Sequence, residues 1–168
     1  MIELFQQFIC SRRNDKAKKK KSEDTDNSFS RQLQRVFETI PYDLGSRDKI
    51  FIPMNEVSHW YLLTIDLKKK IFLVYNSIKG HHTSSYINTM VTSVKKYFSI
   101  HGIPDCDTFQ LIMDNECPQQ KNSYDCGLFV IKFMDCLSQG DRFYFNSGDM
   151  QFERKKIAAQ LLLGKISP

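Results

Sequence analysis

An almost unbroken apolar run in the second half of the chain predicts a core helix. From Leu128 to Leu137 only two positions carry charged side chains, so the run is apolar on all sides. A helix of this kind is expected inside a domain rather than on its surface. Residues of the types that cap helix N-termini precede the run, which places the helix start at or just before Cys126. They are Asn122, Ser123 and Asp125.

Other segments divide by their periodicity into expected helices, strands and loops. Apolar residues recur at helical spacing in four of them: 2–10, 29–40, 84–99 and 149–164. Runs rich in β-branched and aromatic residues predict four strands: 49–53, 57–65, 70–76 and 109–113. Pro53 is expected to end the first strand. The stretch 11–28 is rich in Lys, Asp, Asn and Ser without periodicity, which predicts a flexible basic loop.

Two of the expected strands, 57–65 and 70–76, flank the polar residues 66–69 and so predict a β-hairpin. In the simplest register, His59 pairs directly with Asn76. Opposed residues have Cβ atoms about 4.5–5.5 Å apart on one face of a sheet, so the two side chains would meet. A bulge would break this register. A histidine and an asparagine at strand ends without a joint role is the alternative.

Length and cysteine content limit the class of protein. A chain of 168 residues is expected to form one domain with a sizeable core. Its five cysteines are an odd number and include no Cys-x-x-Cys pair, which argues against a disulfide framework or a zinc ribbon. A reducing compartment, the nucleus or the cytoplasm, is therefore expected. No apolar run approaches the ~20 residues of a membrane span.

Charge and motif content suggest neither a nucleic-acid partner nor a cofactor. Part of the net charge of +5 comes from one run, Lys18 to Lys21, and the rest of the chain is nearly neutral. That run could be a nuclear-import signal, although solvated loop charge is the simpler interpretation. His81 and His82 are adjacent and would point apart in an extended chain, so no metal site is predicted. The chain has no glycine-rich phosphate loop.

Cys126 is the strongest candidate for chemistry. A thiol at a helix N-terminus faces the positive end of the helix dipole, which favours the reactive thiolate. Gly127 removes a side chain where a substrate backbone could approach closely. From these residues alone, an unreactive buried cysteine at a helix start stays an equal alternative.

Four pieces of the chain, taken together and in order, resemble the ubiquitin-like-protein-specific cysteine proteases. This family contains the SUMO proteases and the deneddylating enzymes, with the adenovirus protease as a distant relative. The matching pieces are Phe51-Ile52-Pro53, His59-Trp60, the run Tyr75 to Gly80, and the run Pro118 to Gly127. The likeness covers nearly the whole chain, and the block around Cys126 is its most specific part.

The resemblance implies an α+β, papain-like fold with a central, mainly antiparallel sheet flanked by helices. The nucleophile would lie at the N-terminus of a core helix. By position, Cys126 would be the nucleophile, His59 the general base, Asn76 the residue that orients it, and Gln120 an oxyanion-hole donor alongside the backbone N–H of Cys126. Trp60 would line a narrow channel for a Gly-Gly tail; the alternative is a buried core tryptophan. The family needs no metal or cofactor.

Two departures from the family pattern are visible. The family usually has aspartate where this chain has Asn76. An amide oxygen can accept a hydrogen bond from Nδ1–H of His59, but it brings no charge, so a weakened enzyme is expected. The family's N-terminal Trp-containing segment is also absent, since Trp60 is the only tryptophan. We therefore expect residues 1–168 to form a single, N-terminally shortened catalytic domain.

The leading hypothesis is a cysteine peptidase or isopeptidase that cleaves after the Gly-Gly terminus of SUMO or a related modifier. The expected partners are that ubiquitin-like protein and its conjugates, bound by a monomer without nucleic acid or membrane. The alternative is a degenerate domain that binds a ubiquitin-like protein without cleaving it. An acyltransferase on the same scaffold is a third hypothesis, for which the sequence offers no positive feature.

Overall fold

The structure is a computed structural model that describes residue 35 and residues 44–56, 58–80 and 84–164. The described residues fall into two compact units, the first within 1–48 and 83–109 and the second within 49–82 and 110–168. The expected helix 2–10 and the basic loop 11–28 lie outside the described residues. So do His81, His82 and, apart from Arg35, the expected helix 29–40.

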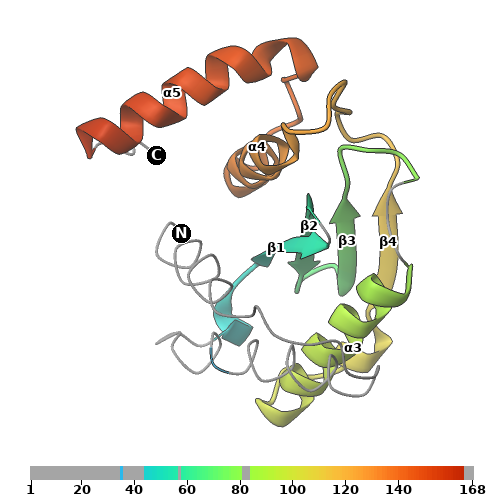
Figure 1. Cartoon of the computed structure of the whole chain (residues 1–168). Helices are drawn as coiled ribbons and strands as arrows, with labels where there is room; N and C mark the ends of the chain where they lie inside the picture. Colours follow the sequence, from blue (N-terminus) through green and yellow to red (C-terminus); the bar gives the residue numbers. More distant parts are fainter. Residues whose placement is uncertain (1–34, 36–43, 57, 81–83, 165–168) are drawn as a thin grey trace, which may run out of the picture. The chain divides into compact units, whose positions relative to one another are not determined.

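The second unit is built on a four-stranded sheet in the order β1-β2-β3-β4 (Figure 1). Its strands are β1 (Lys49–Glu56), β2 (His59–Asp66), β3 (Ile71–Tyr75) and β4 (Gln110–Asp114). The pairs β1–β2 and β2–β3 are antiparallel, whereas β3–β4 is parallel. The expectation of a mainly antiparallel sheet in an α+β chain is therefore confirmed.

The prediction that Pro53 ends the first strand is wrong. β1 continues through Pro53 to Glu56, and Pro53 pairs with Leu62 of β2. Proline removes one backbone donor, which is tolerated on an edge strand because that donor need not face a neighbour. β1 lies at one edge of the described sheet, so the strand passes through the proline.

The predicted hairpin register is wrong by two residues. Ile65 pairs with Phe72 and Leu62 pairs with Tyr75, so β3 ends one residue before Asn76. The cause is Lys70, which takes a left-handed conformation (φ 56°) and belongs to the turn rather than to the strand. A shift of two residues keeps every side chain on its predicted face, because side chains alternate with a period of two.

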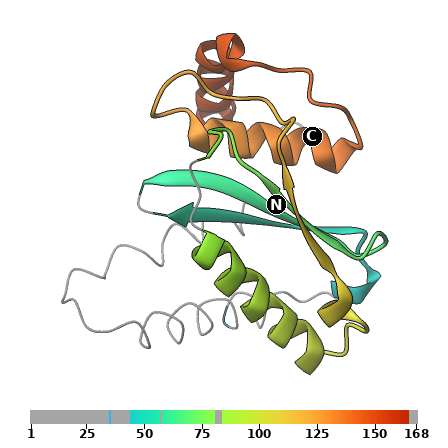
Figure 2. The same ribbon diagram turned by 90° about the vertical axis from the view of Figure 1, so that its right-hand side faces the viewer.

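Helix α4 (Cys126–Gln139) is the predicted core helix and begins at the predicted residue. It packs against the sheet through β2, and Figure 2 shows it between the sheet and helix α5. Its aromatic side chains Phe129 and Phe133 are fully buried, and the centre of the Phe133 ring lies 5.7 Å from that of the Tyr75 ring in β3.

Helix α5 (Met150–Leu163) also forms where its periodicity predicts, but it is mostly exposed. Only Met150 of this helix is buried, and Leu162 is 89% exposed. Phe152 and Leu163 lie on the opposite side of the helix from Met150, so no single surface can cover them all. A 3₁₀ turn, η3 (Ser147–Asp149), leads into the helix.

Ion pairs, rather than a broad apolar interface, tie α5 to α4. Glu153 lies 3.6 Å from the buried Lys132 ammonium, which also contacts Asp135 at 3.0 Å. Burial alone would lower the pKa of Lys132, but its hydrogen bond to Asp135 and the charge of Glu153 outweigh this and raise it. Lys132 therefore stays protonated, and its buried ammonium links α4 to Glu153 of α5.

The first unit contains the helix predicted over 84–99, observed as α3 (Ser84–Ile100). Two 3₁₀ turns accompany it, η1 (Leu44–Ser46) and η2 (Cys106–Thr108). Lys95 of α3 donates to the carbonyl of Asp107 at 2.9 Å, which connects α3 to η2. None of the helices in the described ranges is long and apolar enough to cross a membrane.

Candidate active site

A direct hydrogen bond in the candidate site joins His59 and Asn76. Nε2 of His59 lies 2.8 Å from Oδ1 of Asn76, and both side chains are buried. The backbone N–H of Ile78 donates to the same oxygen at 2.9 Å. Because a backbone N–H can only donate, the atom facing His59 is the amide oxygen, and Nε2 must carry the proton. In the neutral ring the lone pair then lies on Nδ1.

This arrangement confirms the predicted contact and corrects its detail. We expected Nδ1–H of His59 to face Asn76, but Nε2 makes the bond. The contact also does not depend on direct strand pairing, because Asn76 lies just beyond β3. Its side chain reaches His59, the first residue of β2, from that position. The basic nitrogen of the ring is therefore Nδ1.

The first turn of α4 presents the candidate nucleophile. Cys126 is the first residue of the helix and is 4% exposed. Its neighbour Gly127 lies against Trp60, since a Cβ added to the glycine would meet Cδ1 of Trp60 at 3.9 Å. Trp60 follows His59 in β2, so α4 begins beside the strand end that carries the histidine. Trp60 is half-buried, which disfavours the alternative of a fully buried core tryptophan.

Gln120 is held by both ends of its amide. Ser77 Oγ donates to its Oε1 at 2.6 Å, and its Nε2 donates to the carbonyl of Asn122 at 2.5 Å. The carbonyl can only accept, so the orientation of the amide is fixed. Its backbone N–H also donates to the carbonyl of Ser77 at 2.8 Å. An NH₂ group has two hydrogens, so Nε2 can donate to a second acceptor.

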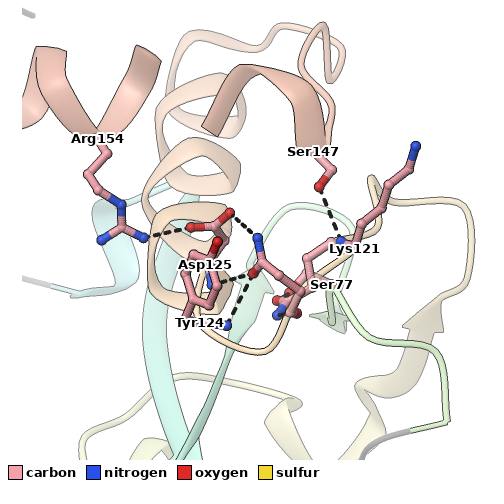
Figure 3. Close-up of polar contacts among 8 residues, drawn as sticks. Ser77, Lys121, Tyr124, Asp125, Ser147 and Arg154 are labelled. Carbon is pink, nitrogen blue, oxygen red and sulfur yellow. Dashed lines mark hydrogen bonds and ion pairs between the residues drawn. The ribbon is translucent and has the colours of Figure 1, made fainter. Parts of the chain in front are cut away.

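The predicted start of α4 is correct, but the expected capping hydrogen bond is not formed. Asp125 is the N-cap residue, yet its side chain makes no capping hydrogen bond. Its carboxylate instead accepts from Nδ2 of Asn122 at 2.7 Å and from Nη2 of Arg154 at 2.6 Å. Figure 3 shows Arg154 reaching Asp125 from α5. The N-cap carboxylate is thus used to hold the loop before the helix.

Three residues of this site were not predicted. Gln119 donates through Nε2 to the carbonyl of Asn76 at 3.0 Å, and Ser77 holds Gln120. Both residues lie in the runs that resemble the protease family, each next to a candidate site residue. Their position in the sequence could therefore have indicated a role in the site. Arg154 had no such signal, because it lies 29 residues from Asp125 along the chain.

The other buried thiols of the described residues differ from a nucleophile. Burial raises the pKa of Cys117 to about 11. Burial also raises the pKa values of Cys106 and Cys136. These thiols stay neutral and unreactive at physiological pH. Within the described ranges, no group of three or more His, Cys, Asp or Glu residues could hold a metal ion.

Comparison with known proteins agrees with this geometry. Residues 1–163 match the family described as "Ulp1 protease family, C-terminal catalytic domain". The chain is 32% identical over 126 residues to putative ubiquitin-like-specific protease 1B of Arabidopsis thaliana, covering 73% of this chain and 37% of that protein. It is also 32% identical over 128 residues to human sentrin-specific protease 5, covering 73% and 16%. The chain therefore spans well under half of these two relatives.

Solved structures of Ulp1 proteases are similar to this chain. A structure of the SUMO protease Ulp1 with its catalytic cysteine oxidised to a sulfonic acid superimposes with a TM-score of 0.73. The two chains are 28% identical, and the match covers 97% of this chain and 76% of that one. A second, the C-terminal Ulp1 protease domain in complex with Smt3, the yeast ortholog of SUMO, gives 0.68 at 29% identity, covering 82% and 62%. With a family match along nearly its full length, the chain belongs to the Ulp1 protease family.

Proposed function

We propose that this chain is a cysteine peptidase or isopeptidase that cleaves after the Gly-Gly terminus of SUMO or a related ubiquitin-like modifier. The observation that carries the proposal is the buried His59–Asn76 hydrogen bond, made at the strand end beside which the Cys126 helix begins. Membership of the Ulp1 family and the relative solved with Smt3 support the substrate class. The modifier and its conjugates are then the partners of this chain.

The first steps of the reaction form a tetrahedral intermediate. Nδ1 of His59 removes the proton from the Cys126 thiol, and the thiolate attacks the carbonyl carbon of the terminal glycine. The carbonyl oxygen becomes an oxyanion, which the second N–H of Gln120 and the backbone N–H of Cys126 stabilise. The backbone donor is available because the first N–H groups of a helix have no partner within it.

The remaining steps form the acyl-enzyme and then release the modifier. The imidazolium of His59 returns its proton to the leaving amine, and the C–N bond breaks. A water molecule then loses a proton to Nδ1 and attacks the thioester, which frees the modifier carboxylate and restores the thiol. Asn76 keeps Nε2 protonated throughout, so Nδ1 remains the nitrogen that accepts and donates.

Trp60 and Gly127 form the proposed approach for the Gly-Gly tail. The absence of a side chain at Gly127 leaves the ring of Trp60 facing backbone at the start of α4. The Trp60 ring on one side and the Gly127 backbone on the other would accept an extended tail without side chains and exclude larger residues. We further propose that the chain acts as a monomer in the nucleus or the cytoplasm, where thiols stay reduced.

A modifier-based probe tests the proposal directly. SUMO and a Nedd-type protein, each ending in Gly-Gly with a thiol-reactive electrophile, are incubated with the chain. We expect one covalent adduct with a SUMO-type probe, mapped to Cys126 by mass spectrometry. Labelling should fall after His59→Ala, which removes the general base. Adduct formation at another cysteine, or none with either probe, would contradict the proposal.

The binding-only hypothesis remains the second candidate because Asn76 brings no charge to the site. Here the chain would bind the modifier but form no adduct. Calorimetric titration with unmodified SUMO separates the two functions, since it reports binding whether or not Cys126 reacts.

Replacing Asn76 with aspartate is expected to raise the cleavage rate at neutral pH. The carboxylate can keep the bonds to His59 and to the backbone N–H of Ile78. Because position 76 is buried, its charge is weakly screened and stabilises the imidazolium, and with it the thiolate. A shift of one pKa unit corresponds to about a tenfold change, so we expect roughly tenfold or more.

The pH dependence of kcat/KM checks the cause of this increase. The alkaline limb, which reports loss of the imidazolium proton, should move to higher pH in Asn76→Asp. In Asn76→Ala, which removes the acceptor, the rate should fall. If Asn76→Asp folds but is no faster than the parent, the amide is no handicap, and the chain is an effective Cys-His-Asn enzyme.

A further inference from the structure

We propose that Arg154 of α5 is a positioning residue for the oxyanion loop, which we define as residues 119–125. The inference rests on the proposed function, in which Gln120 supplies an oxyanion donor. Its basis is a continuous series of hydrogen bonds from α5 to the Gln120 amide. Figure 3 shows Arg154 bound to Asp125 on one side of the loop, with Ser147 and Ser77 on the other.

Each link in the series is short and oriented. Arg154 donates to Oδ1 of Asp125 at 2.6 Å, and the other carboxylate oxygen accepts from Nδ2 of Asn122 at 2.7 Å. Asn122 is fixed in turn, because its Oδ1 accepts the backbone N–H groups of Tyr124 at 3.1 Å and Asp125 at 3.0 Å. Its carbonyl accepts Nε2 of Gln120. A movement of Asp125 is therefore passed to the amide that would face the oxyanion.

The charges explain why Arg154 matters despite its exposure. The Asp125 side chain is only 6% exposed, whereas that of Arg154 is 53% exposed. A buried carboxylate needs compensating donors, and Arg154 is the cation that lies against it. Without Arg154, the Asp125 side chain would turn toward solvent, and this movement would release Asn122.

Further contacts fix the position of the oxyanion loop. Ser147 of η3 accepts the backbone N–H of Lys121 at 3.1 Å, and Ser77 holds Gln120 from the sheet side. The Arg154 guanidinium also lies 5.9 Å from the centre of the Tyr124 ring. The Glu153–Lys132 pair fixes the turn of α5 that carries Arg154. The segment around α5 thus acts on the site without touching the substrate.

Steady-state cleavage of a SUMO C-terminal Gly-Gly amide substrate tests the inference. Misplacement of a catalytic group can cost up to about a hundredfold in rate, and a partial loss of order in the loop should cost Arg154→Met about tenfold in kcat. KM should change less than twofold, because the affected donor acts in the transition state. Arg154→Lys, which keeps the charge, should restore most of kcat.

A double-mutant cycle separates positioning from general stability. Gln120→Ala removes the group through which Arg154 is proposed to act, so adding Arg154→Met should lower kcat by less than about twofold further. Lys155→Met is the matched control, since it removes one cation from the next, exposed position of α5. This control should keep kcat within about twofold of the parent.

Several results would overturn the inference. One is an unchanged kcat in folded Arg154→Met while Gln120→Ala lowers it, which leaves the proposed function intact. Another is a full tenfold loss that persists in the Gln120→Ala background. If Gln120→Ala itself has no effect, both the inference and the oxyanion role of Gln120 fail. If circular dichroism shows that Arg154→Met does not fold, Asp125→Asn is used instead, because it removes the same ion pair. The same changes in kcat then decide the outcome.

Discussion

Replacing Cys126 with alanine is expected to abolish cleavage of a Gly-Gly amide while leaving modifier binding intact. Alanine cannot form the acyl-enzyme, and loss of a nucleophile in a comparable catalytic unit costs about 10⁶ in kcat. Binding should persist, because the Cys126 side chain is small and 4% exposed. Turnover is followed with a fluorescent SUMO amide, and the Kd by calorimetry with uncleaved SUMO.

Cys136→Ala is the matched control for this variant. Cys136 lies in the same helix and is fully buried, with a pKa raised by burial. Its loss should reduce stability through packing but leave kcat within severalfold. Residual turnover in Cys126→Ala, or equal losses in the two variants, would show that another group is the nucleophile.

Replacing Gln120 with alanine is expected to lower kcat by about 10²–10³ with little change in KM. The loss of one oxyanion-hole donor costs about 3–4 kcal/mol in comparable enzymes. The geometry fits this role, because the Asn122 carbonyl orients Nε2 and leaves it a second hydrogen to donate. Only the transition state develops the charge that this hydrogen stabilises, so substrate binding is spared.

Gln120→Glu sharpens this test. The glutamate has nearly the same shape, but it offers no N–H and adds a negative charge where the oxyanion forms. Its kcat should fall at least as far as that of Gln120→Ala. An increase in KM without a change in kcat, in either variant, would instead assign Gln120 to uniform substrate binding.

The sequence predicted the elements that have strong local causes. The apolar run after Cys126 determined α4 and its first residue, because both periodicity and capping residues point to the same place. The hairpin was foreseen but its register was not. The left-handed conformation of Lys70 depends on how the turn closes, and a non-glycine residue gives no signal for it.

The candidate site divides in the same way. His59, Asn76, Gln120 and Cys126 lie in blocks that resemble a known family, so the resemblance made them candidates before the fold was known. The nitrogen that His59 turns to Asn76 followed from the fold, since it depends on the relative placement of two chain segments. Arg154 was invisible in the sequence, because an arginine on an exposed helix is usually a solvated charge.

The shallow attachment of α5 has a consequence for how the molecule loses activity on warming. Because Met150 is its only buried residue, α5 should be the least stable helix of the second compact unit. Its amides would exchange with deuterium before those of α4 and the sheet. Release of α5 would free Asp125 while the core stays folded, so thermal inactivation would precede global unfolding. Catalysis would then report on the weakest element of the fold rather than on the strongest.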